Sequence, residues 1–194
     1  KFITAGVGKL VSNLTIRYVV ATSILLAGMV VSQAIFAGWG QYRGFTASEL
    51  DEQRVADLKA TGANLVRLSF NKKPLMYKKP PYKLNLKSFA RLDRAIDLCE
   101  EHGLKIVIDP HTAPGMLKRN TSTPRDPFWS SYEWHEKLIA LWDAISRRYA
   151  KRGDVIAGYE LINEPSVPRT PEGVPKSGPA DYNELVGKLV ATIR

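Results

Sequence analysis

The feature that most constrains the fold is an alternation of short apolar segments with longer amphipathic segments. Three segments have the length and composition of buried strands: 63–70, 104–110 and 154–165. Four segments show helical periodicity: 46–62, 84–103, 128–153 and 181–194. Near-continuous apolar strands separated by helices of this length predict a parallel sheet with right-handed crossovers.

The ends of the predicted helices carry capping signals. Thr46 and Glu49 have the spacing of a capping box, so the first helix is expected to begin there. Asp126 precedes a proline at the first helical turn and is expected to cap the third helix. Glycines are expected to end three helices: Gly62, Gly103 and Gly153.

The strands are not followed by a glycine-rich phosphate loop. The sequence contains neither G-x-G-x-x-G nor G-x-x-x-x-G-K-[ST], which argues against a nucleotide-binding doubly wound fold. The α/β architecture that remains is a TIM (β/α)8 barrel, and its first four β/α units account for the pattern seen here. We expect residues 35–194 to form this amino-terminal half of a barrel.

Residues 1–34 have the three parts of a secretory signal peptide. Basic residues precede an uncharged segment at 18–31, and Ser32 and Ala34 have the small-residue spacing that signal peptidase requires. This pattern predicts a secreted, extracellular protein. The alternative is an uncleaved membrane anchor, because the uncharged stretch continues to Ala37 and is long enough to span a bilayer.

The formal net charge is +9, which raises the question of an anionic partner. Many lysines and arginines lie on the polar faces of predicted helices, so we interpret them as solvated surface and expect no nucleic-acid partner. Five lysines gather between two predicted elements, in what we call the lysine loop (residues 72–83). The single cysteine, Cys99, excludes an internal disulfide and is expected to be buried.

No metal or cofactor site is predicted. The three histidines, His102, His111 and His135, lie outside any HExxH or CxxC context. His102 directly precedes Gly103 at the end of a helix, where a positive charge is favourable.

Polar side chains stand at the carboxyl ends of the predicted strands. They are Arg67, Asp109, His111, Asn163 and Glu164. In a barrel, the carboxyl ends of the strands meet at one mouth, where active sites are found. Arg67 lies inside an apolar segment and is costly to bury unless it meets a carboxylate, for which Asp109, Glu160 and Glu164 are available.

Three of these stretches resemble glycoside hydrolase family 5, the cellulase family of retaining (β/α)8 glycosidases. They are GANLVRLSF (62–70), GLKIVIDPHTAPG (103–115) and GYELINEP (158–165). The resemblance implies that Glu164 is the general acid/base and that Asn163 holds a sugar 2-hydroxyl. It also implies that Arg67 and His111 line the subsite where the bond breaks. The implied activity is hydrolysis of a β-1,4-glucan or a related polysaccharide, with no cofactor.

A retaining glycosidase needs a second carboxylate as its nucleophile. The resemblance places this residue on a seventh strand, so we expect it beyond residue 194 and expect the chain alone to be inactive. A separate carboxyl-terminal half is then a possible partner. Two alternatives are a non-catalytic carbohydrate-binding half-barrel and a membrane-anchored interaction protein that uses the lysine loop.

Tryptophans in loops are candidates for sugar platforms, because a ring face packs on the apolar face of a pyranose. Trp39 and Trp129 fall in or beside predicted loops at the mouth and are the expected platforms. Trp134 and Trp142 lie in a predicted helix and are expected to belong to the core.

Overall fold

The computed structural model describes residues 41–117, 123–173 and 176–194 of the 194-residue chain. The predicted signal peptide and Trp39 lie outside these ranges. The chain divides into two units, residues 1–42 and 43–194, and the second contains all the elements described below. Among the described residues, no helix combines the length and hydrophobicity that crossing a membrane requires.

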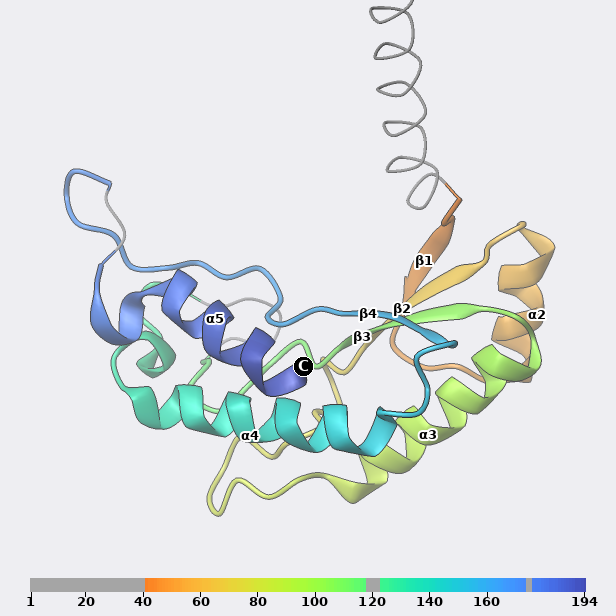
Figure 1. Cartoon of the computed structure of the whole chain (residues 1–194), viewed down its shortest axis with the longest axis horizontal. Helices are drawn as coiled ribbons and strands as arrows, with labels where there is room; N and C mark the ends of the chain where they lie inside the picture. Colours follow the sequence, from red (N-terminus) through yellow and green to blue (C-terminus); the bar gives the residue numbers. More distant parts are fainter. Residues whose placement is uncertain (1–40, 118–122, 174–175) are drawn as a thin grey trace, which may run out of the picture. The chain divides into compact units, whose positions relative to one another are not determined.

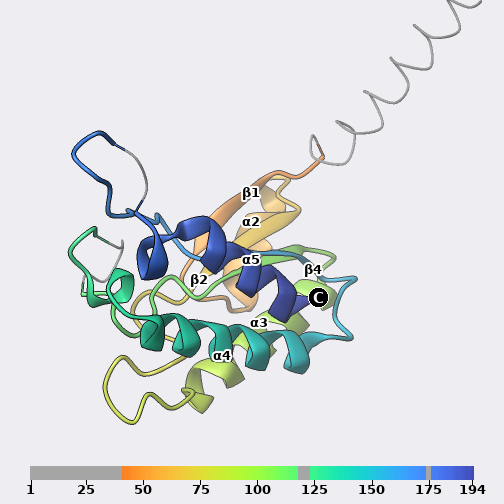
Figure 2. The same ribbon diagram turned by 60° about the vertical axis from the view of Figure 1, so that its left-hand side comes forward.

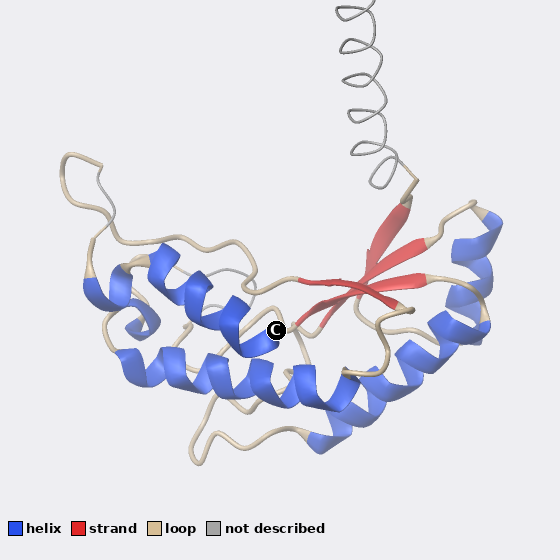
Figure 3. Cartoon of the chain, in the orientation of Figure 1, coloured by secondary structure: helices blue, strands red, loops and turns tan. Residues whose placement is uncertain are grey.

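The described strands form one parallel sheet in the order β1-β2-β3-β4 (Figures 1 and 3). The strands are β1 (Gly44–Ala47), β2 (Leu65–Ser69), β3 (Lys105–Asp109) and β4 (Ile156–Tyr159). Each neighbouring pair is parallel, with Ser69 opposite Asp109 at the carboxyl ends of β2 and β3. The predicted alternation of strands and helices, in the order of a barrel's first four units, is therefore confirmed.

Helices connect the strands and follow the last one. They are α2 (Glu52–Ala60), α3 (Leu86–Glu101), α4 (Tyr132–Tyr149) and α5 (Tyr182–Ile193), with short 3-10 turns η1 (Pro127–Trp129) and η2 (Gly178–Ala180). Figures 1 and 2 show α4 and α5 side by side in both views, as their close packing requires.

The first helix begins later than its predicted capping box. Asp51 caps α2 by accepting a hydrogen bond from the Arg54 backbone N–H at 2.9 Å. Thr46 instead lies in β1, opposite Arg67, where the extended backbone is needed for the sheet. The capping-box prediction was wrong because Thr46 is part of β1, and Asp51, which directly precedes the helix, provides the N-cap.

The cap predicted at Asp126 is also wrong for α4. The Asp126 carboxylate accepts hydrogen bonds from the Thr123 backbone N–H at 3.1 Å and from its hydroxyl at 2.7 Å. Ser131 caps α4 through the Glu133 N–H. At the other end, α4 stops at Tyr149, before the predicted Gly153.

Two predicted glycine stops are confirmed. Gly62 follows the C-cap of α2, and Gly103 follows that of α3. Their φ angles are +79° and +64°. Both angles lie in the left-handed region that glycine adopts without a steric penalty.

The two faces of the sheet differ in burial. Val66, Leu68, Ile106 and Ile108 are each 2% exposed or less and pack in the core with the helices, including the predicted Trp142 and Cys99. On the opposite face, the side chains of Leu65 and Arg67 in β2 and of Lys105 and Val107 in β3 are partly exposed. In Figure 3, helices α2, α3 and α4 lie to the right of and below the strands. The face that bears Arg67 corresponds to the interior of a barrel.

The outer edge of β1 presents an open, partly apolar surface. Phe45 on this strand is 56% exposed, and a cavity of about 470 Å³ beside it is lined by residues that include Phe45, Ala47 and Leu58. Unpaired strand edges template association with other chains. The described residues contain no strand that covers this edge.

We therefore expect the isolated chain to self-associate or to be poorly soluble. Light scattering after gel filtration measures this, and Phe45→Lys should reduce the associated fraction by placing a charge on the edge. Leu86→Lys is the matched control, because Leu86 is 73% exposed but lies on α3, away from the sheet edge. A monodisperse monomer that unfolds cooperatively would contradict the prediction.

Candidate active site

Arg67, on β2, is the centre of a polar network on the uncovered face of the sheet. Its guanidinium forms a bidentate ion pair with Glu160, in which Nη2 lies 2.7 Å from Oε1. Nη2 also lies 2.8 Å from Asp109 Oδ2 and 2.8 Å from Asn163 Oδ1. The expectation that Arg67 needs a carboxylate partner is confirmed for Asp109 and Glu160.

Asp109 is the most deeply buried member of the network, with its side chain 0% exposed. Burial raises the pKa of Asp109, whereas the hydrogen bond from His111 and the charge of Arg67 act in the opposite direction. The residue ends β3 directly opposite Ser69 of β2. Asp109 therefore depends on neighbouring donors to remain inside the fold as a carboxylate.

His111 joins this network through one ring nitrogen. Its Nδ1 lies 2.6 Å from Asp109 Oδ2 and 2.9 Å from Ser69 Oγ. The backbone of His111 has a φ of +65°, a conformation uncommon for residues other than glycine. Non-glycine residues in this region cluster at functional sites, where the surrounding structure holds them.

Glu164 follows β4 and is the exposed carboxylate of the group. Its φ of +43° is also in the left-handed region. The adjacent Asn163 is 5% exposed and reaches Arg67 through its side chain. The indole of Trp142 donates to the Leu161 carbonyl at 3.0 Å, which fixes the segment between β4 and this pair.

The structure thus brings together four of the predicted site residues: Arg67, His111, Asn163 and Glu164. Arg67 donates a hydrogen bond to Asn163 and forms an ion pair with Asp109, which also contacts His111. The charge of Glu164 acts on Arg67. Ser69 is a member that the sequence did not single out, since a serine within a strand carries no motif. Its position opposite Asp109 is the structural signal that identifies it.

Trp129 does not form an exposed platform in this structure. Its side chain is 4% exposed and packs edge-on against Phe128 and His135, with ring centroids 4.9 and 6.1 Å away. Its indole N–H is buried without a hydrogen-bond partner among the described residues. The η1 turn folds this ring into the core, so an aromatic in a predicted loop does not by itself indicate exposure. Trp134, in α4, packs partly buried against the core as predicted.

His135 is buried in the same aromatic group, 1% exposed, between Phe128, Trp129 and Tyr132. Desolvation lowers the pKa of His135, because the charged imidazolium is disfavoured there. A histidine with a lowered folded-state pKa contributes stability that is present above its unfolded pKa. This stability is lost as the pH falls toward the folded value.

We expect the free energy of unfolding to fall as the pH decreases below about 6.5, which is the pKa of an unperturbed histidine. His135 contributes at most about 1.4 kcal/mol to this fall for each pH unit. Urea unfolding at pH 7 and pH 5 measures the change. His135→Gln should flatten the dependence. His102→Gln, which alters an exposed histidine, is the control, and an equal effect of both variants would contradict the assignment.

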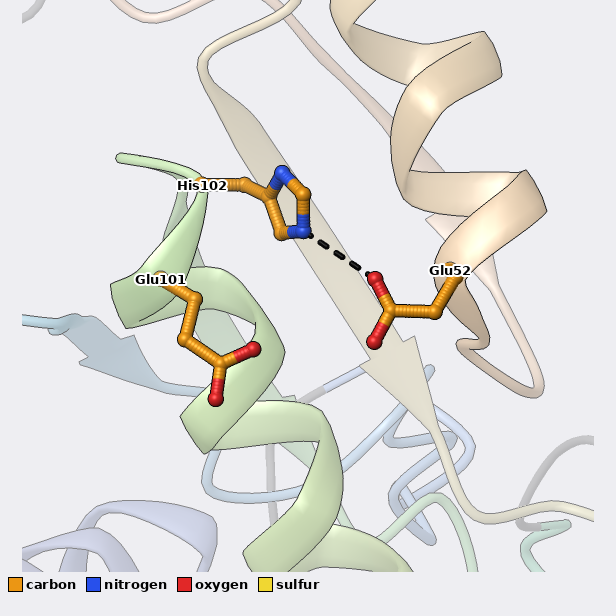
Figure 4. Close-up of side chains that lie close together, drawn as sticks. All are labelled: Glu52, Glu101 and His102. Atoms are coloured by element: carbon orange, nitrogen blue, oxygen red, sulfur yellow. Dashed lines mark hydrogen bonds and ion pairs between the residues drawn. The ribbon is translucent and has the colours of Figure 1, made fainter.

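A second cluster, away from the Arg67 network, has the ligand types of a metal site. Figure 4 shows the His102 ring facing the Glu52 carboxylate, with Glu101 beside them. Ligand atoms of the three residues lie within 4.8 Å of one another. Arg94 already pairs with Glu52 and, at 3.5 Å, with Glu101, and His102 Nε2 lies 3.1 Å from Glu52. We interpret the group as a surface ion-pair network that links α2 to the end of α3.

Curated relatives match parts of this chain. A β-xylosidase from Phanerodontia chrysosporium is 36% identical over 119 residues, which is 58% of this chain and 24% of the relative. A probable glucan 1,3-beta-glucosidase A from Neosartorya fischeri is 34% identical over 104 residues, 53% of this chain and 24% of the relative. The matches thus span about a quarter of these relatives' length.

Solved structures show the same fold. Cel5A from Thermotoga maritima, in complex with mannotriose, matches 79% of this chain and 48% of its own, with 23% identity and a TM-score of 0.53. The same enzyme as a mutant in complex with cellobiose matches 79% and 50%, with 22% identity and a TM-score of 0.52. The four β/α units described here correspond to about half of those TIM barrels.

A family model covers the chain more fully than any of these pairwise matches. The cellulase model, glycosyl hydrolase family 5, matches residues 23–194. This range contains the whole sheet and the network around Arg67. The chain belongs to glycoside hydrolase family 5.

Proposed function

We propose that this chain supplies the acid/base half of a retaining β-glycoside hydrolase, with Glu164 as the proton donor. The observation that carries the proposal is the position of Glu164. It is an exposed carboxylate in the segment that follows β4, beside the network of Arg67, Asp109, His111 and Asn163. Polar residues at the carboxyl ends of barrel strands form the active site in enzymes of this fold.

The side chains around Glu164 suit this role. A general acid must lose a proton to the leaving oxygen and then accept one from water, so it must be accessible. Asn163 accepts a hydrogen bond from Arg67 through its Oδ1, and its amide N–H group is the type of donor that binds a sugar hydroxyl. A hydrogen bond of that kind, if it strengthens as charge develops on the sugar, contributes to the rate.

The nucleophile in this proposal lies outside the chain. A retaining mechanism needs a second carboxylate about 5 to 5.5 Å from the acid/base. Asp109 and Glu160 are the nearby candidates, but both are ion-paired to Arg67. We assign them the structural role of holding Arg67, and we place the nucleophile on a later strand of the barrel.

The proposed substrate is a β-1,4-linked glucan, cleaved as an endoglucanase or cellulase does. Solved structures of the same fold include an endoglucanase, Cel5A from Pseudomonas stutzeri, and Cel5A from Thermotoga maritima in complex with cellobiose. The curated relatives offer a second candidate, since their names include a β-xylosidase and glucan 1,3-beta-glucosidases. The proposed partner is therefore a β-glucan or a related polysaccharide.

The test uses a completed barrel, meaning this chain continued by four further β/α units from a solved family 5 barrel. Its rate is measured on soluble cellulose, β-1,3-glucan and xylan, and the anomer released is followed by proton NMR. Retained configuration with fastest release from cellulose supports the proposal. Fastest release from β-1,3-glucan or xylan would favour the second candidate, and binding without hydrolysis would support a carbohydrate-binding role instead.

We also propose that the protein is secreted, from the uncharged segment and cleavage pattern within residues 1–34. Sequencing the amino terminus of the protein recovered from the culture medium tests this. A new terminus after Ala34 or Ala37 supports secretion. Recovery only in the membrane fraction with the segment intact would support the anchored alternative.

A further inference from the structure

Ser69 and Asp109 both contact the same atom of His111, which raises the question of where the imidazole proton lies. The Nδ1 atom is 2.6 Å from Asp109 Oδ2 and 2.9 Å from Ser69 Oγ. Asp109 Oδ2 is also 2.8 Å from Arg67 Nη2. The nearby guanidinium charge favours the ionised form of Asp109. A carboxylate oxygen can only accept, so Nδ1 is the donor in the contact with Asp109.

This assignment also fixes the part played by Ser69. A protonated Nδ1 has no lone pair, so the serine hydroxyl cannot donate to it. The hydroxyl oxygen instead accepts from the same Nδ1–H group, which forms a bifurcated hydrogen bond to Asp109 and Ser69. Ser69 is 6% exposed and Asp109 is fully buried, so neither contact is replaced easily by bulk water. The two acceptors come from neighbouring strands, because Ser69 and Asp109 are opposite each other in the β2–β3 register.

We propose that Ser69 is a positioning residue that acts through His111. Together with Asp109 it holds the imidazole in the Nδ1–H form, which leaves the lone pair on Nε2, at the part of the ring that faces away from both acceptors. Nε2 of neutral His111 then accepts a hydrogen bond from a hydroxyl group. Resting on the proposed function, that hydroxyl belongs to the sugar at the bond to be cleaved.

The charged groups around His111 stay in place when Ser69 is replaced, so the variant removes one hydrogen-bond acceptor and no charge. Asp109 contacts the ring directly, and Arg67 and Glu160 belong to the same network. These three residues are unchanged in Ser69→Ala. A hydrogen bond from Nδ1–H is stronger when the ring is charged, so removing the hydroxyl acceptor disfavours the protonated form.

The test is nitrogen NMR of the full chain labelled at histidine. His102→Gln and His135→Gln variants assign the signals of the other two histidines. At high pH, neutral His111 in the wild type should show a protonated Nδ1 and an unprotonated Nε2. Ser69→Ala should lower the proton affinity of His111 about twofold to tenfold, the range expected for one hydrogen bond. Ser69→Thr, which keeps the hydroxyl, should restore the wild-type titration.

Ser88→Ala is the matched control, because Ser88 is 1% exposed and its hydroxyl donates to the Lys73 carbonyl, outside the network. It should leave the His111 titration unchanged. The proposal is overturned if neutral His111 carries its proton on Nε2, or if Ser69→Ala and Ser88→Ala titrate alike. The tautomer of neutral His111 is measured on the wild type alone, so this test remains valid even if Ser69→Ala fails to fold. The readout involves no hydrolysis, so an inactive completed barrel would leave this result intact and would count against the proposed function alone.

Discussion

Replacing Glu164 by glutamine in the completed barrel is expected to lower the hydrolysis of β-glucans by about 10²–10⁴-fold, the usual contribution of a general acid. The amide keeps the size of the side chain but cannot donate a proton to the leaving oxygen as a carboxylic acid does. Polysaccharides have poor leaving groups, so they depend fully on this proton. Steady-state rates on soluble cellulose measure the loss.

The choice of substrate separates a proton donor from other roles. Aryl glycosides with an acidic phenol need little protonation, so formation of their glycosyl-enzyme should survive in Glu164→Gln. Hydrolysis of that intermediate then lacks a general base to activate water. External azide, which needs no base, should restore turnover and release a glycosyl azide of retained configuration.

Two variants serve as controls for the Glu164 experiment. Glu172→Gln makes the same chemical change at another exposed glutamate in the loop after β4, and it should leave all rates unchanged. Asn163→Ala should lower the rates on both substrate types together, because it removes a contact to the sugar and no proton. Equal loss on both substrate types in Glu164→Gln, with no azide effect, would show that Glu164 is structural or is the nucleophile.

The strands and the composition of the site could be predicted from the sequence because they depend on local pattern. Short apolar runs between glycine-ended helices define β2, β3 and β4, and an arginine within an apolar strand requires carboxylates nearby. Which carboxylates it meets depends on strand register. Arg67 is opposite Val107, and Val107 is opposite Gly158 after an irregularity in β3–β4 pairing, which aligns Asp109 and Glu160 on the same face.

The cap of α2, the burial of Trp129 and the role of Ser69 could not be predicted from the sequence, because each depends on contacts that the sequence pattern does not show. Thr46 has the spacing of a helix cap, but its backbone belongs to β1, and Asp51 provides the cap. Trp129 follows a proline in a loop, yet the η1 turn directs the ring into the core. Ser69 has no sequence signal because its role arises only across the β2–β3 pair.

Replacing Arg67 by methionine is expected to cost about 3–5 kcal/mol of unfolding free energy, because it leaves a buried carboxylate without its cation. The Asp109 side chain is 0% exposed, and Arg67 also binds Glu160 and Asn163. Methionine keeps much of the apolar stem while removing the charge. Urea unfolding of the completed barrel measures the loss.

Arg147→Met is the matched control, since it removes an arginine from an exposed pair with Asp143, in which the side chains are 78% and 43% exposed. An exposed pair of this kind contributes about 0–1 kcal/mol. Arg67→Lys should fall between the two variants, because lysine keeps the charge but not the planar fork that binds Glu160 through two nitrogens. Equal losses for Arg67→Met and Arg147→Met would contradict a buried network.

The pH dependence of Arg67→Met identifies Asp109 as the source of the loss. Burial already raises the pKa of Asp109, and removing the arginine charge raises it further. A carboxyl group whose folded-state pKa is raised stabilises the fold fully below its unfolded pKa, and that stability is lost as the pH rises through the folded value. The deficit of Arg67→Met should therefore shrink as the pH falls from 7 toward 4. Adding Asp109→Asn should recover part of the loss at pH 7, and a deficit independent of pH with no recovery would place the cost in Glu160 instead.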